Sequence, residues 1–378
     1  AEQYLSLGRL YQQAAEYDAA IEHYSKAEHI SRVTHGLYGP EQFLPIELSI
    51  ECHLARGEFA AAMERREYLV YLHRRHYGHD AVETVPQMLA LGDMYFTAFE
   101  RGIHRQPGMP ELEFGPETNF VDPSKLSQLD IAFRWLDQAR NQYYASIRNL
   151  VAHEDFSNPL LFDLESNLIE TLFLQAWRRS IELDPLFFVN LREPNARDTL
   201  TFDRQEERMP LYRDGEDAFT RMLAYLDASS TAAPLQVAEM MLQLGDWHML
   251  FGKHKRGLAQ YDAARAYLVD NGVDEPQIAA LMAPPVPVQL PVFRAAPHSL
   301  AQLTPSAAPE FDGYIDVALT LDRVGGVKAI DVLGKSENAA PAVEARLRKV
   351  LRSAPFRPRL ADTGSDDSLA LRYYFAKL

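Results

Sequence analysis

The chain has 378 residues, of which 47% are hydrophobic, so it is long enough for two domains or for one repeat array with an added module. Its formal net charge is −15, and the acidic excess lies before residue 311, where 27 basic residues stand against 44 acidic ones. This charge disfavours nucleic acid as a partner, because phosphate binding needs a basic surface. The single cysteine, Cys52, excludes an internal disulfide, and no apolar run reaches the length of a membrane helix.

The first 31 residues carry the spacing of two packed helices joined by a turn at 15–18. Apolar side chains recur every three or four positions on both helices, and small residues stand where the two backbones come close. This pattern resembles the tetratricopeptide repeat. A single hairpin of that kind cannot bury its apolar face, so further hairpins are expected to follow it. The residues that carry the resemblance are Tyr4, Leu7, Gly8, Tyr11, Ala20, Tyr24 and Ala27.

Two further hairpins are predicted at a long period. The second is degenerate and turns at 57–59, and the third opens with Leu91 and Gly92. From the first Leu-Gly pair to this one is 84 residues, or two periods of 42, which resembles the repeats of kinesin-light-chain-like proteins. Four prolines within 102–129 forbid a long helix there. We interpret 102–129 as an insertion that packs across the groove, before the partner helix resumes at Asp130.

The second half of the helical region continues this alternation. An apolar face predicts a helix over 158–181, and the polar, arginine-rich residues 182–214 predict a second insertion. Gly215 is expected to open a helix through Tyr225. A last hairpin is marked in order by Met241, Leu244, Gly245, Gly252, Gly257, Tyr261 and Ala264. Residues 1–282 are therefore predicted to form a tetratricopeptide-like α-solenoid with insertions near 102–129 and 182–214.

A different module is predicted after a linker. Residues 283–310 contain seven prolines and no paired apolar periodicity, which favours an extended, polyproline-like chain. Alternating apolar residues then predict a strand at 315–321, a hairpin turn at 324–327 and a return strand at 328–333. An amphipathic helix over 341–354 and a final strand over 368–376 follow. The predicted fold class is mainly α, with a solenoid followed by a small α+β module of β-β-α-β order at 311–378.

This module resembles the C-terminal domain of the TonB family. The resemblance rests on residues 313–317, 322–327 and 354–360, the last of which read Ala-Pro-Phe-Arg-Pro-Arg-Leu. It implies that the module binds an extended peptide by strand addition in a bacterial envelope. The chain departs from a TonB transducer because no membrane helix precedes the linker, which reaches on the order of 90 Å at most. The chain begins at Ala1 without Met, so a removed leader or an anchor in a longer protein stays open.

Two sets of residues are predicted to bind partners. The first set lies on the concave face that such repeats build from the first helix of each hairpin, where acidic and apolar side chains suit a peptide with basic and hydrophobic residues. This predicted groove consists of Arg9, Gln12, Gln13, Glu51, Leu54, Asp93, Phe96, Asp246 and Met249. The second set is the predicted strand-addition edge, which consists of Leu369, Leu371, Arg372, Tyr373, Tyr374 and Phe375.

No residue set points to a reaction or to a bound cofactor. His73, His76 and His79 have a spacing that zinc can use, but no Cys or carboxylate motif accompanies them, so we favour a solvated basic helix end. The basic residues of the module, Arg357 among them, are interpreted as a solvated face. The sequence contains no GxSxG, HExxH, Walker or dinucleotide motif. We therefore predict a protein that is not an enzyme and that uses no cofactor and no metal.

The sequence predicts a non-enzymatic interaction scaffold or adaptor in the periplasm of a Gram-negative bacterium, with the cytoplasm left open. The groove would hold one protein, and the last strand would pair with a peptide of another protein or with a second copy. In a second hypothesis the module docks on the acidic solenoid or dimerises, and only the groove binds. A third is TonB-type energy transduction, with an anchor ahead of this chain. An enzyme would need a pocket gathering His104, Glu182 or Arg204.

Overall fold

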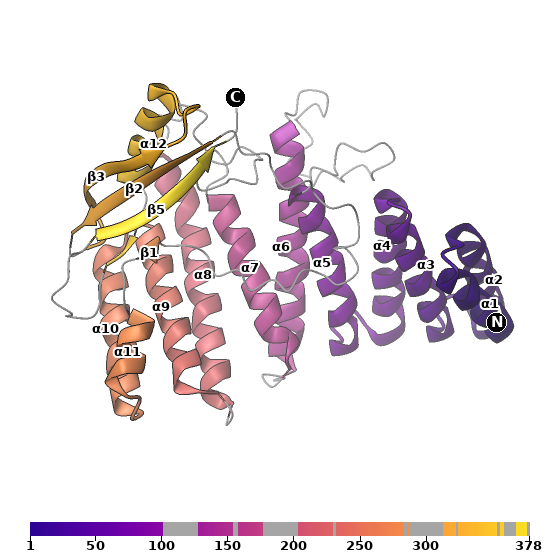
Figure 1. Ribbon diagram of the computed structural model, residues 1–378. Coiled ribbons are helices and arrows are strands. Elements are labelled where there is room, and N and C mark those ends of the chain that lie inside the picture. Colours follow the sequence, from indigo (N-terminus) through magenta and orange to yellow (C-terminus); the bar gives the residue numbers. More distant parts are fainter. Residues whose placement is uncertain are drawn as a thin grey trace. The chain divides into compact units, whose positions relative to one another are not determined.

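A computed structural model describes residues 1–100, 128–153, 158–176, 203–229, 232–282, 286–287, 313–322, 324–353, 356–358 and 368–375 (Figure 1). These residues are mainly helical, with a small three-stranded antiparallel sheet near the C-terminus. By their contacts they fall into two units, one of residues 1–171 and one from Leu172 onward. The predicted insertions lie outside the described residues over 102–127 and 182–202. Among the described helices, none combines the length and apolar character needed to cross a membrane.

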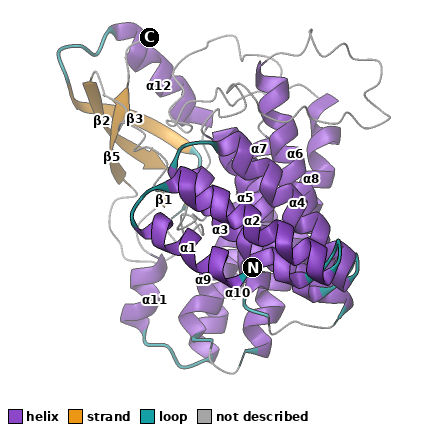
Figure 2. Cartoon of the chain, turned by 90° about the vertical axis from the view of Figure 1, so that its right-hand side faces the viewer, coloured by secondary structure: helices purple, strands orange, loops and turns teal. Residues whose placement is uncertain are grey.

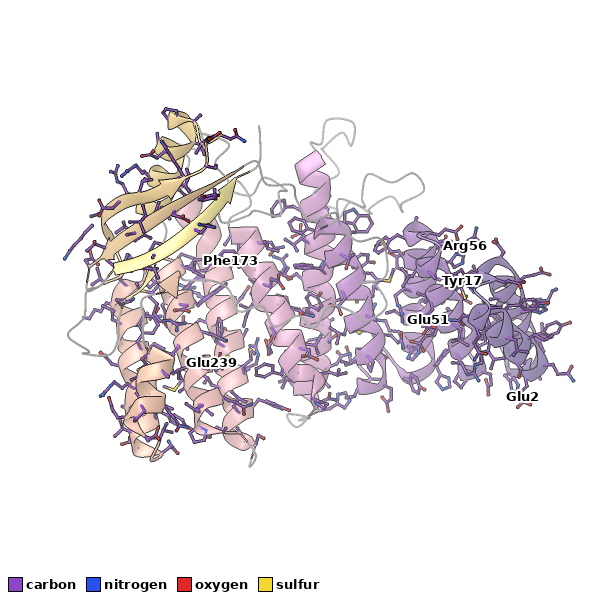
Figure 3. All side chains as sticks on the ribbon, in the orientation of Figure 1. Glu2, Tyr17, Glu51, Arg56, Phe173 and Glu239 are labelled. Atoms are coloured by element: carbon purple, nitrogen blue, oxygen red, sulfur yellow. The ribbon has the colours of Figure 1, made fainter. Side chains whose placement is uncertain are left out.

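The first unit consists of helices that pack in antiparallel pairs. α1 (Glu2–Gln13) packs on α2 (Tyr17–His35), α3 (Phe43–Ala55) on α4 (Phe59–Tyr77), and α5 (Val85–Glu100) on α6 (Gln128–Ala152). Short 3₁₀ turns, Pro40–Gln42 and Val82–Thr84, precede α3 and α5, and α7 (Leu160–Ala176) crosses the boundary between the units. Figure 3 labels Tyr17 and Arg56 at the turn ends of the first two hairpins, where Arg56 forms an ion pair with Asp18.

Three hairpins share one backbone turn. Ala15, Gly57 and Gly252 have φ values of 60°, 77° and 70°, and in each turn the next N–H donates to the carbonyl five residues back. This left-handed residue satisfies the last carbonyls of the first helix and reverses the chain. The sequence predicted the turns at 15–18 and 57–59, and it placed Gly252 within the last hairpin.

The first, third and last hairpins each bring a glycine of one helix against a tyrosine ring of its partner helix. A Cβ at any of these glycines would approach ring carbons to 2.6 Å or closer, which real Cβ atoms do not do. The prediction that small residues stand where two helices approach closely is therefore confirmed at these positions. The pairs are Gly8 with Tyr24, Gly92 with Tyr143, and Gly245 with Tyr261.

The second unit contains α8 (Asp203–Ala228), α9 (Pro234–Leu250), α10 (His254–Asp270) and the short α11 (Glu275–Met282). The last hairpin lies where it was predicted, as α9 and α10. The short helix α11 was not predicted from the sequence, and it packs against α10 through Ile278 and Met282. Both side chains join the core of the last hairpin.

The prediction of an irregular stretch as far as Asp214 is wrong over 203–214, because α8 already begins at Asp203. The polar, arginine-rich sequence favoured a loop, but tertiary packing outweighs that preference. The carbonyl of Tyr212 accepts a hydrogen bond from Trp247 Nε1 at 3.0 Å, and the Tyr212 ring lies 5.3 Å from that of Phe251. Gly215 does not open the helix. It lies inside α8, where a Cβ would overlap the indole of Trp247.

The C-terminal sheet has the predicted β-β-α-β order. β2 (Gly313–Leu321) pairs with both β3 (Val327–Lys335) and β5 (Ser368–Phe375), so the strand order is β3-β2-β5. α12 (Pro341–Ser353) lies beside these strands (Figure 2). Alternate residues of β2 build the core with side chains of α12 and with Phe356. These residues are Ile315, Val317, Leu319, Leu321, Leu347 and Leu351.

Two further short strands connect the sheet with the preceding helices. β4 (Phe356–Arg357) pairs in antiparallel fashion with β1 (Val286–Pro287). β1 lies within residues 283–310, which the sequence analysis interpreted as an extended linker. An extended backbone is also what a strand requires, and here its polar groups find a partner. The sheet and the last hairpin therefore belong to one unit.

Candidate interaction sites

Part of the predicted groove comes together in the first two hairpins. Gln12 on α1 donates from Nε2 to Oε2 of Glu51 on α3 at 2.9 Å, and it accepts a 2.5 Å hydrogen bond from the Tyr24 hydroxyl. Arg9, Gln13 and Glu51 are exposed. These residues form one polar, solvent-facing patch on neighbouring helices, with Glu51 labelled in Figure 3. We call Arg9, Gln12, Gln13 and Glu51 the N-terminal patch.

Four members of the predicted groove offer no surface to a partner. Leu54, Phe96, Asp246 and Met249 expose 4% or less of their surface. The prediction carried one repeat position from hairpin to hairpin, but neighbouring elements cover that position in this structure. The predicted groove is therefore corrected to its N-terminal members, and Asp93 is half-buried.

Asp93 and Asp246 occupy equivalent places in two hairpins. Each follows a Leu-Gly pair, and each accepts a hydrogen bond on Oδ1 from the tyrosine that faces this glycine, at 2.8 Å from Tyr143 and 2.7 Å from Tyr261. Asp93 also accepts a 3.0 Å bond from Nδ2 of Asn167 on α7, the next helix. Asp93 thus accepts a hydrogen bond from an element outside its own hairpin, and Asp246 does the same.

For Asp246 the partner is β4, the short strand whose Phe356 packs in the core of the C-terminal sheet. Arg357 on β4 donates from Nε to Asp246 Oδ1 at 2.9 Å and from Nη2 to Oδ2, and its guanidinium lies 5.8 Å from the Tyr261 ring centre. Asp246 is 4% exposed. Burial raises the pKa of the Asp246 carboxyl, and the bonds from Arg357 and Tyr261 oppose that rise. This bidentate ion pair corrects the interpretation of Arg357 as part of a solvated basic face.

The turn between β2 and β3 adds to the same contact. Gly325 has a φ of 82°, and a Cβ there would overlap the Phe356 carbonyl oxygen and approach Met249 Cε to 3.4 Å. The turn therefore packs against β4 and faces α9. The ion pair, the β1–β4 pairing and this turn together hold the sheet on the last hairpin; we call them the docking contact.

The sequence contained a signal for the docking contact. Leu-Gly-Asp occurs at 91–93 and again at 244–246, each time ahead of a tyrosine on the partner helix. A repeated acidic residue beside the closest helix approach marks an acceptor that must be satisfied once it is buried. The partner could not be identified in the same way, because Arg357 is 111 residues away.

The predicted strand-addition edge lies on β5, at one side of the sheet. β5 pairs with β2 without interruption from Gly313↔Phe375 to Thr320↔Ser368. β3, at the other side, has two register irregularities, and its bulged Leu333 is 64% exposed. Bulges twist an edge and weaken it as a template for further strands. Among the described residues, β5 is therefore the regular edge.

The three predicted candidate zinc ligands do not gather. His73 is buried and its ring stacks on Phe43, with ring centres 4.0 Å apart, whereas His79 is exposed next to Asp80. Within the described ranges, no three His, Cys, Asp or Glu side chains form a set that could hold a metal ion. The candidate enzymatic residues His104 and Glu182 lie outside the described residues, and the side chain of Arg204 is not described.

A second buried histidine joins α8, α9 and α10. The His248 Nδ1 lies 3.0 Å from the Tyr212 hydroxyl, which accepts a 3.0 Å bond from Arg256, and Arg256 pairs with Glu216 at 2.8 Å. Burial lowers the pKa of His248, Glu216 opposes this and Arg256 adds to it. Burial likewise lowers the pKa of His73 in the first unit.

These two histidines predict loss of stability in mild acid. An unfolded histidine titrates near 6.5, and the folded pKa of both residues lies lower, so the unfolded chain binds protons first as the pH falls. Their contribution is present above pH 6.5 and is lost as the pH falls below it. We expect the thermal midpoint of His248→Gln to depend less on pH between 7.5 and 5.5 than that of the wild type. Exposed His254→Gln is the control, and an unchanged pH slope in H248Q would contradict the prediction.

Comparison with known protein families finds no family model that matches this chain, and comparison with curated protein sequences finds no significant match. The two resemblances described above therefore rest on the residues of this chain alone.

Proposed function

We propose that this chain is a non-enzymatic scaffold of a Gram-negative envelope, built as a tetratricopeptide-like solenoid with a TonB-like module at its C-terminal end. The solenoid assignment is supported by the three glycine–tyrosine contacts and by the shared left-handed turn. The module assignment is supported by the β-β-α-β order and by the place of Phe356 and Arg357 after the helix.

The observation that carries the proposed function is the uninterrupted edge of β5. An edge strand presents N–H and C=O groups that an added strand can satisfy, and a regular register is what such pairing needs. Partner binding by the module is therefore assigned to β5 and not to the bulged β3 edge. The N-terminal patch supplies a second, polar surface for a separate protein partner.

A second candidate function is favoured by the docking contact. The sheet is held on the last hairpin by a buried ion pair, so the module can serve as a structural end piece of the repeats. Only the N-terminal patch would then bind a partner. The two candidates differ in whether the β5 edge is needed for any interaction.

The test uses two neighbouring proline substitutions in β5. Backbone N–H groups of consecutive strand residues point to opposite sides, so of Ala370→Pro and Leu371→Pro one removes a bond to β2 and the other removes only an N–H on the side away from β2. Circular dichroism identifies the variant that stays folded. We expect this variant to lose those partners that the wild-type chain captures from a bacterial envelope extract through strand addition.

The comparison needs a variant of the other surface. Glu51→Arg in the N-terminal patch should remove a different set of partners and spare those of β5. If the folded proline variant captures the same proteins as the wild type, the structural role of the module is favoured and strand addition is rejected.

A further inference from the structure

The carboxylate of Asp246, which also accepts a bond from Tyr261, is stabilised by a cation when its surface is covered. Asp246 is 4% exposed, and a buried carboxylate without a positive partner is strongly unfavourable. In the equivalent place Asp93 is half-buried and takes a neutral amide from Asn167. The last hairpin thus has an acceptor that suits an arginine on an extended strand, and Arg357 on β4 fills it here.

The docking contact joins two bodies with separate cores. The sheet has a core of its own, formed by β2, β3, α12 and Phe356. The last hairpin has another, which includes α11. The sequence places 25 residues between β1 and β2, and such a length reaches on the order of 80 Å when extended. The docking contact consists of surfaces that every copy of the chain carries.

We propose that the C-terminal sheet exchanges between copies, so that Arg357 of one copy fills the Asp246 site of a second copy. The exchanged sheet brings the same β4 strand to β1 and the same Gly325 turn to α9. Such swapping adds no new kind of contact, because each copy supplies the same two surfaces. This inference goes beyond the proposed function, because neither β5 nor the N-terminal patch takes part.

The exchange is weak at low concentration in the wild-type chain. A sheet on the same chain meets its own hairpin at a much higher effective concentration than a second copy provides, so the docking contact forms within one copy at micromolar protein. A dimer is expected as the concentration rises. Weakening the contact within a copy, while keeping it between copies, should bring the dimer into the micromolar range.

Charge reversal distinguishes docking within one copy from exchange between two copies. The variant Asp246→Arg has two arginines at the docking contact, and Arg357→Asp has two aspartates, so neither can pair within itself. In a mixture of the two, each sheet finds an opposite charge only on the other copy. We expect each variant alone to be monomeric by light scattering and the mixture to form a one-to-one dimer. The double variant D246R/R357D should be a monomer, because its reversed pair forms again within one copy.

The exposed pair of Asp316 and Arg372 provides the matched control. It lies inside the sheet, with Arg372 Nε 2.7 Å from Asp316 Oδ1, so exchange of the sheet leaves it intact. A mixture of D316R and R372D should stay monomeric. If D246R and R357D are folded by circular dichroism and their mixture remains monomeric by light scattering in the micromolar range, exchange is rejected. Should either reversal prevent folding, the milder pair D246K and R357E gives the same decision.

Discussion

Replacing Arg357 by glutamine is expected to lower the stability of the second unit by about 3–5 kcal/mol, because it leaves the buried Asp246 carboxylate without its cation. This corresponds to a fall in the thermal midpoint of that unit of roughly 6–20 °C. The first unit does not contain the pair, so its transition should stay in place. Thermal unfolding followed by circular dichroism measures both.

The loss has an upper limit set by the docking contact itself. If the sheet leaves the hairpin, Asp246 becomes hydrated and is no longer a buried unpaired charge. The variant then loses only the free energy of the docking contact. Limited proteolysis distinguishes these outcomes, since a released sheet is cut faster while the hairpin core stays resistant. In both cases the wild-type chain is the more stable protein.

The double variant Asp246→Asn with Arg357→Gln tests the physical reason. Two neutral amides can bond each other and leave no buried charge, so the double variant should recover much of what R357Q loses. Arg372→Gln is the control, because it breaks an arginine–aspartate pair at the surface and should change the midpoint far less. Equal losses in R357Q and in the double variant would show that the charge of Asp246 is not the cause.

Local spacing was enough to predict the hairpins. Gly8, Gly92 and Gly245 stand where a tyrosine of the partner helix requires the space of a side chain. The alternation in β2 likewise identified the buried face of the sheet, with Ile315 and Val317 at 1% and 0% exposure. Such features depend on neighbours in sequence, which is why one sequence suffices.

The docking contact could not be predicted, because it depends on residues far apart in the chain. Asp246 was assigned to an open groove from its repeat position, and Arg357 to a solvated face from its basic neighbours. Each assignment was reasonable for the local sequence, and the pairing of the two residues overturned both. The helical start of α8 was missed for a similar reason, since Tyr212 is held by Trp247 and Phe251 of another helix.

Gly325→Ala is expected to lower the stability of the second unit by about 2–5 kcal/mol. A residue with a Cβ at a φ of 82° costs about 1–2 kcal/mol, and forcing its Cβ against the Phe356 carbonyl adds about 1–3 kcal/mol. Backbone cannot move aside as a flexible side chain can, so the turn must shift away from β4. The docking contact would then weaken together with the turn.

Gly272→Ala separates the cost of the backbone conformation from the cost of the steric overlap. Gly272 follows α10 with a φ of 71°, but a Cβ there meets nothing within 4 Å, so this variant should lose only the conformational part of about 1–2 kcal/mol. Both variants lie in the second unit, and urea unfolding of the full chain measures them on one scale. A larger loss for G325A than for G272A places the β2–β3 turn against β4 in solution. Equal losses would mean that the turn does not pack there, and the docking contact would then rest on Arg357 and the β1–β4 pairing alone.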